Sequence, residues 1–115
     1  MSAVTPARVL FSQRLASFRV ARGMSQRGLG DAMGLGKQVG SVRINRYEQQ
    51  ERFPALDDLD LLAATLDIPV AALLASDEST ARAICALARL TDAEREAAAT
   101  RLEELVAKAA AFSEG

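Results

Sequence analysis

The side chains with the clearest chemical potential in this sequence are its arginines, and most of them fall in its first half. Residues 1–56 carry nine Arg or Lys against three acidic residues, a net charge of +6. Residues 57–115 carry five basic and twelve acidic residues, a net charge of −7. Guanidinium and ammonium groups bind phosphate, and such an asymmetry within a small chain is typical of a protein that meets a polyanion. The first half therefore indicates nucleic acid as the partner.

Groups that serve catalysis or metal binding are scarce. The sequence has no His and one Cys, so neither a general base of the commonest type nor a zinc site is expected. Gly28, Gly30 and Gly34 lack the preceding strand and the spacing of a nucleotide-binding loop. We therefore expect no cofactor, no metal and no enzymatic activity. Cys85 has no partner for an internal disulfide, which fits a reducing cytoplasm.

The basic first half and the segment that follows it both show sequence patterns typical of helices. Ala and Leu dominate the composition and only five residues are aromatic, which favours short packed helices over strands. Gly23 ends the first amphipathic pattern, and Ser25 is suited to cap the next. Helices are expected at about residues 9–22, 26–33, 41–49, 56–66 and 69–74. No apolar run approaches the roughly 20 residues that cross a bilayer, so no membrane association is expected.

The order of these residues resembles the phage-repressor and Cro-like helix-turn-helix family, also called the XRE family. The resemblance covers roughly Phe11 to Leu74 and rests on Gly23-Met24-Ser25-Gln26, Leu29-Gly30, Met33-Gly34, Arg43-Ile44-Asn45-Arg46-Tyr47-Glu48, Pro54-Ala55-Leu56, Leu59, Leu62-Ala63, Leu66 and Ile68. It implies an all-α, five-helix bundle whose third helix enters the DNA major groove. We accordingly expect a helix-turn-helix domain over residues 1–76, with its core at 9–75, and a helical tail over residues 77–115.

The resemblance also implies which side chains read DNA bases. The matching positions are Ser41, Val42 and Arg46, on a recognition helix expected at about 41–49. The Arg46 guanidinium can bond both O6 and N7 of guanine, and Val42 can meet a thymine methyl group. Ser41 can contact either a base or a phosphate.

Other positions match residues that hold the DNA backbone or shape the motif. Gln26 matches a phosphate contact at the start of the second helix, where the helix dipole favours an anion. Glu48 matches a position that orients neighbouring arginines, and Gly30 matches one where a small residue lets the recognition helix cross closely. The full set of expected backbone contacts is Gln26, Arg27, Lys37, Gln38, Arg43, Asn45 and Arg52.

One departure from the family pattern concerns the turn before the recognition helix. Gly34 and Tyr47 are thirteen positions apart, about four more than the family usually has. We interpret residues 35–40 as an enlarged turn on which Lys37 and Gln38 touch phosphates. The recognition helix would then begin at Ser41.

The acidic tail beyond Asp77 predicts two further helices. Thr91 and Glu94 form a capping-box pattern that opens the second. An apolar series in that helix alternates spacings of four and three, the seam of a short coiled coil: Ala98, Leu102, Leu105, Ala109 and Phe112. We expect a helical hairpin that dimerises the protein and whose negative charge keeps it off DNA. The alternative is a hairpin that folds back onto the core.

These patterns indicate a cytoplasmic, sequence-specific transcriptional regulator that binds double-stranded DNA. Because single domains of this type read few base pairs, we expect a homodimeric repressor on a palindromic operator. The alternative, from another class, is an antitoxin or adaptor whose tail binds a partner protein. A stable homodimer would favour the regulator, and an unpaired tail seam in the purified protein would favour the adaptor.

Overall fold

Residues 4–114, the part of the chain that this computed structural model describes, contain seven helical elements and no strand. The expected all-α fold is therefore confirmed. The elements are α1 (Ala7–Ala21), α2 (Gln26–Ala32), α3 (Lys37–Glu48), α4 (Leu56–Leu66), the 3-10 helix η1 (Val70–Leu74), α5 (Glu78–Ala88) and α6 (Asp92–Glu114). Within these residues no helix has the length and apolar character that a bilayer crossing requires.

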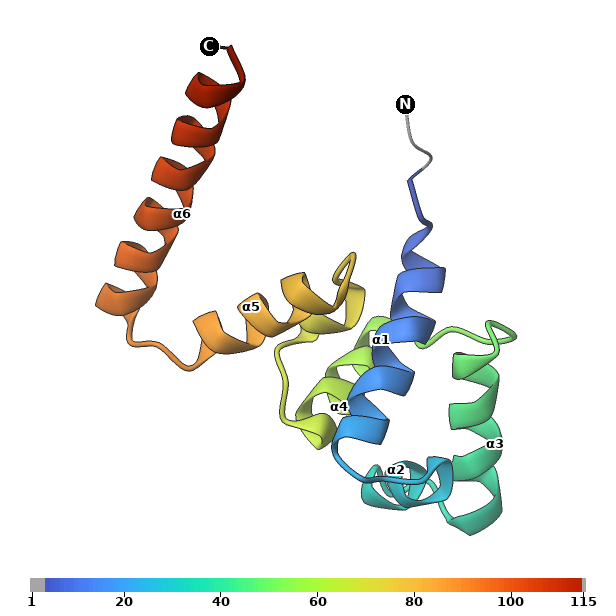
Figure 1. The fold of residues 1–115 in the computed structure, drawn as a ribbon. Coiled ribbons are helices and arrows are strands. Elements are labelled where there is room, and N and C mark those ends of the chain that lie inside the picture. The colour runs from blue at the N-terminus through green and yellow to red at the C-terminus, as the bar shows by residue number, and fades with distance from the viewer. Residues whose placement is uncertain (1–3, 115) are drawn as a thin grey trace.

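The helices α1 to α4 and η1 surround a single apolar core (Figure 1). Phe11 of α1 and Tyr47 of α3 pack edge to face, with ring centroids 5.8 Å apart. The buried Ser12 hydroxyl donates a hydrogen bond to the Tyr47 carbonyl oxygen at 2.7 Å, which ties α1 to the end of α3. The core as a whole comprises Phe11, Leu15, Leu29, Met33, Ile44, Tyr47, Leu59, Leu62, Ala63, Leu66, Ile68, Ala72 and Leu73.

The start of α3 corrects the sequence interpretation of an enlarged turn. The helix begins at Lys37, directly after Gly36 at φ +71°, so the residues expected to enlarge the turn form an additional helical turn instead. The recognition helix, expected at about 41–49, spans Lys37–Glu48. The expectation of a loop was wrong for residues 37–40, because the four positions beyond the usual family spacing lengthen the helix and not the turn.

The close approach of α2 and α3 explains why a glycine lies at position 40 within the helix. A Cβ atom added to Gly30 would lie 2.5 Å from the Gly40 Cα, and one added to Gly40 would lie 2.8 Å from the Gly30 Cα. The two helices therefore cross backbone to backbone, which only glycine allows at both positions. The expected close crossing at Gly30 is confirmed. Its partner Gly40 lies ten residues away, so no local pattern reveals the pairing.

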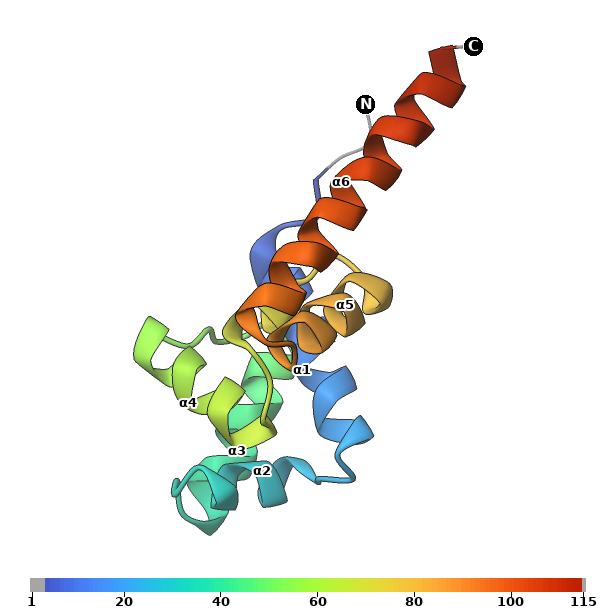
Figure 2. The ribbon, with the colours of Figure 1, turned by 90° about the vertical axis from the view of Figure 1, so that its left-hand side faces the viewer.

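The tail separates into one helix that packs on the bundle and one that leaves it. Ala81 of α5 is buried, and Ile84 and Cys85 pack against the core. An ion pair of 2.9 Å joins Glu78 at the start of α5 to the buried Arg14 of α1. α6 instead projects away from the bundle (Figures 1 and 2), and residues 100–113 are all exposed.

The two tail helices form an open elbow, so the expected helical hairpin was wrong. Arg95 of α6 bridges the turn between them, because its Nε and Nη2 donate to the carbonyl oxygens of Leu87 in α5 and of Leu90 in the turn, at 3.0 and 2.7 Å. These hydrogen bonds satisfy carbonyl groups at and after the end of α5. The capping box is confirmed: the Thr91 amide donates to Glu94 at 2.8 Å and the Glu94 amide to Thr91 at 3.2 Å. The hydrogen bond from the Thr91 amide to the carboxylate lowers the pKa of Glu94.

Candidate nucleic-acid interface

The face of α3 that points away from the core carries the candidate base-reading residues. Ile44 and Tyr47 lie on the inner side with 0% and 1% exposure, whereas Val42 is 48% exposed. Arg46 is also exposed, and Ser41 is half-buried on the flank of the helix. Helical periodicity explains this division, since residues three and four positions apart share a face.

Two hollows flank this outward face. One, of about 300 Å³, is lined by Gln38, Val39, Val42, Arg43, Arg46 and Arg52. The other, of about 460 Å³, is lined by Arg27, Gln38, Ser41 and Val42. Gln38 and Val42 line both hollows and therefore form the ridge between them. The fold thus brings the three candidate base-reading residues together with arginines from α2, α3 and the loop that follows α3.

A hydrogen-bonded network joins the start of α2 to the end of α3. Gln26 donates from Nε2 to Asn45 at 3.2 Å and to Glu48 at 3.1 Å. Glu48 also accepts two hydrogen bonds from the Arg19 guanidinium, at 2.6 Å from Nε and 2.9 Å from Nη2. The hydrogen bonds to Glu48 raise the pKa of Arg19 above its usual value. The network holds Gln26 and Asn45, two expected backbone contacts, in one fixed arrangement.

Several basic residues of the first half that the structure describes have structural partners within the fold. Arg14 pairs with Glu78, and Arg19 pairs with Glu48. Arg22 donates to the carbonyl oxygens of Leu66 at 2.9 Å and Asp67 at 3.3 Å, and so caps the end of α4. Glu48 was expected to orient neighbouring arginines, and Arg19 is one that it binds. The partners of Arg14 and Arg22 were not expected, because they lie more than 40 positions away along the chain.

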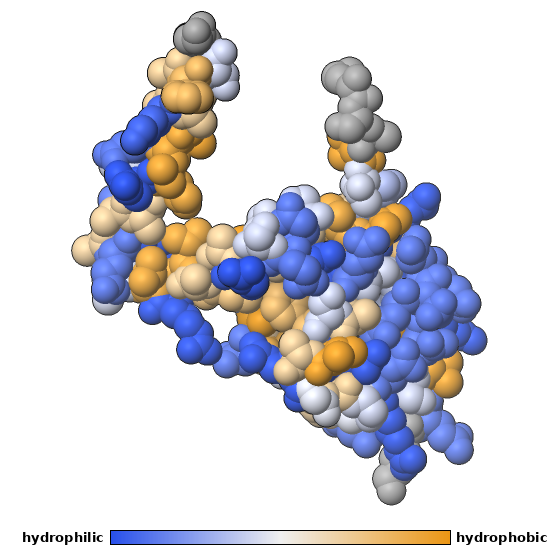
Figure 3. All heavy atoms as spheres, in the orientation of Figure 1, coloured by the Kyte–Doolittle hydropathy of each residue, from blue (hydrophilic) through white to orange (hydrophobic). Residues whose placement is uncertain are grey.

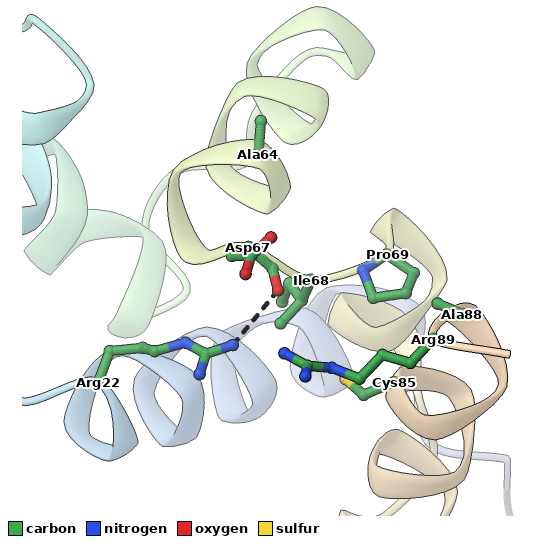
Figure 4. A pocket seen from close by; sticks show the side chains of 8 residues that line it. All are labelled: Arg22, Ala64, Asp67, Ile68, Pro69, Cys85, Ala88 and Arg89. Carbon is green, nitrogen blue, oxygen red and sulfur yellow. Dashed lines mark hydrogen bonds between the residues drawn. The ribbon is translucent and has the colours of Figure 1, made fainter.

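A pocket of about 440 Å³ lies between α1, the end of α4 and α5, apart from the two hollows beside α3 (Figure 4). Its lining residues are Arg22, Ala64, Asp67, Ile68, Pro69, Cys85, Ala88 and Arg89. Figure 4 shows the Arg22 guanidinium reaching across it to Asp67. Arg22 thus connects α1 to α4 and takes no part in the face that α3 presents.

The remaining expected backbone contacts differ in their surroundings. Arg27 and Arg52 are exposed beside α3, and Gln38 is exposed in its first turn. Arg43 is half-buried, and its Nε has no hydrogen-bond partner among the described residues. The Lys37 side chain lies outside the part of the chain that the structure describes. Within that part, no group of three or more Cys, Asp or Glu is placed to hold a metal ion.

Comparisons with known proteins agree with this geometry. A family model described as helix-turn-helix matches residues 15–73. Among solved structures, the chain is similar to the crystal structure of transcriptional regulator BswR, with a TM-score of 0.70 and 29% sequence identity. The similarity covers 84% of this chain and 96% of that chain. No curated protein matches the sequence.

Proposed function

Because this chain belongs to the XRE-type helix-turn-helix family of DNA-binding transcriptional regulators, we propose that it is a homodimeric repressor of a palindromic operator. The observation that carries the proposal is the outward face of α3. Its exposed residues Gln38 and Val42 lie between two hollows, and arginines line both of these hollows. A helix of about 10–12 Å diameter fits the major groove, which is about 12 Å wide. We place this regulator in the cytoplasm, in keeping with its DNA partner and its single unpaired thiol.

We assign three residues to base readout and seven to the DNA backbone. Ser41, Val42 and Arg46 would face the base edges, with Arg46 bonding guanine in two places. The backbone contacts would be Gln26, Arg27, Lys37, Gln38, Arg43, Asn45 and Arg52. Because most of these are cationic, affinity would come largely from counterion release and fall steeply as salt rises.

The second half of the proposal is dimerisation through α6. This helix has 23 residues, and its exposed apolar side chains include Leu102 and Leu105, at 50% and 49% exposure, and Phe112 at 89%. Most of the stability of a helix in water comes from burying its apolar face. The described part of this chain does not bury that face of α6. A second copy would supply that burial and place two α3 helices on successive half-sites.

The test of DNA readout is a binding selection from random duplexes with the wild-type protein and Arg46→Ala, at two salt concentrations. We expect a palindromic motif for the wild type and loss of one guanine preference in each half-site for the variant. Arg82→Ala, which removes an exposed arginine of α5, serves as the matched control and should keep the motif. Weak, sequence-independent binding by all three proteins would contradict the proposal.

A second candidate function, an antitoxin or adaptor, is favoured by the same exposed seam of α6. In that case the seam would bind a different protein and the purified chain would be monomeric. DNA binding and partner binding are compatible in one molecule, so the oligomeric state of the purified protein separates the two candidates.

A further inference from the structure

The pocket that lies apart from α3 is formed where three helices end. Arg22, Asp67 and Arg89 directly follow the last residues of α1, α4 and α5. All three line the pocket, whose volume is about 440 Å³. Protein sites for small molecules have volumes of about 300–1,000 Å³, so this pocket is large enough to hold one.

Two guanidinium groups supply positive charge to the pocket. Figure 4 shows those of Arg22 and Arg89 extending toward each other from the ends of α1 and α5. Arg22 uses Nε and Nη2 to bond the carbonyl oxygens of Leu66 and Asp67, and its Nη1 has no partner among the described residues. No hydrogen bond or ion pair within that part of the chain engages the Arg89 guanidinium. A carboxylate placed between the two groups would find charged donors on both sides.

Groups of the opposite sign border the same pocket. The Asp67 carboxylate has no hydrogen-bond or ion-pair partner in the part of the chain that the structure describes. The three helix ends add the partial negative charge of their carbonyl groups, about half an elementary charge for each helix. These groups disfavour a simple anion and favour a ligand that also carries an ammonium group.

The rest of the lining is apolar and small. Its residues come from α4, from the segment between α4 and η1, and from α5: Ala64, Ile68, Pro69, Cys85 and Ala88. Ile68 belongs to the buried core, so this part of the lining is held in place by packing. Side chains of this kind suit a short aliphatic group.

We propose that this pocket binds a free α-amino acid with a small aliphatic side chain. Its carboxylate lies between Arg22 and Arg89, its ammonium group meets Asp67, and its side chain contacts Ile68. The bound molecule connects the bundle to α5, the helix that leads into α6. Because the pocket lies apart from the outward face of α3, binding here does not require α3 to contact DNA.

The first test is isothermal titration calorimetry of the full chain with L-alanine, L-valine and L-leucine. We expect saturable binding of at least one of them. Analogues of the best ligand that lack one charged group should bind roughly 10- to 150-fold more weakly, because each loses charge-assisted hydrogen bonds. For valine these analogues are isovalerate, which lacks the ammonium group, and isobutylamine, which lacks the carboxylate.

The second test repeats the titration with variants of the lining. Arg89→Ala and Asp67→Asn should each weaken binding by a similar factor. Asparagine tolerates the left-handed φ of +55° at position 67, so that variant removes the charge without straining the backbone. Arg82→Ala removes an exposed arginine of α5 outside the lining and should bind like the wild type.

Three results would overturn the proposal. The first is that none of the three amino acids binds the wild type, and the second is that the analogue without an ammonium group binds as tightly as its parent. The third is that either lining variant, shown to be folded by thermal denaturation, binds like the wild type. The comparison of analogues uses the wild type alone, so it decides the question even where a variant fails to fold.

Discussion

At the scale of single residues, the Arg19–Glu48 pair connects the core to the DNA-facing side. The Glu48 side chain is 7% exposed and that of Arg19 is 16% exposed, so both charges depend on each other for solvation. Glu48 also holds the Gln26 amide. Removing the carboxylate would leave a largely buried guanidinium with only the Met24 carbonyl oxygen as an acceptor.

We predict that Glu48→Ala lowers the free energy of unfolding by about 2–3 kcal/mol, toward the low end for a broken buried pair because Arg19 keeps some contact with water. DNA affinity should also fall, since Gln26 loses one of its two partners. Urea denaturation followed by circular dichroism measures the first effect. Glu51→Ala, at an exposed acid in the following loop, is the matched control. Equal stability of the two variants would show that the pair contributes nothing.

At the scale of elements, the fit between α2 and α3 decides where the recognition helix begins and how it is held. The contact is backbone to backbone at Gly30 and Gly40, so an added methyl group has no side chain to displace. The family usually accepts Ala at the position of Gly30, but Gly40 makes the approach closer in this chain.

We predict that Gly30→Ala destabilises the protein by up to about 2 kcal/mol, because an overpacking cost of about 1–3 kcal/mol is only partly offset by the helix propensity of about 1 kcal/mol that Ala gains. The shift of α3 should also weaken DNA binding. Thermal denaturation and a fluorescence anisotropy titration measure the two effects. The control is Gly28→Ala on the same helix, whose methyl group would meet only the Ser25 hydroxyl at 3.1 Å. If Gly30→Ala proved more stable than wild type, the close crossing would be disproved.

At the scale of the whole molecule, α6 gives the chain its elongated shape of 58 × 37 × 24 Å. The side of α6 that faces the bundle is apolar and its opposite side is hydrophilic, and the apolar surface continues onto α5 (Figure 3). Because α6 projects from the bundle, this apolar surface is left uncovered by the described part of the chain.

We predict that Leu102→Glu combined with Leu105→Glu converts a dimer into a monomer, because both leucines lie on the seam and a buried unpaired charge is costly. Analytical ultracentrifugation measures the change, and operator affinity should fall with it. Thr100→Glu, an exposed change off the seam, is the control and should leave the dimer intact. A wild-type protein that sediments as a monomer at all concentrations would favour the adaptor function instead.

The sequence by itself determined the helical class, the family and most of the helix boundaries, since caps, periodicity and glycines act within a few residues. The capping box at Thr91 and the inward positions of Ile44 and Tyr47 belong to this local information. Only the tertiary structure decided where α3 begins, which arginines remain free beside it and that α5 and α6 form an open elbow. For α3 and its arginines the cause is a contact between separate elements: Gly40 lies against the backbone of Gly30, and Arg19 binds Glu48. Such contacts depend on where the chain returns in space, and local sequence patterns do not specify it.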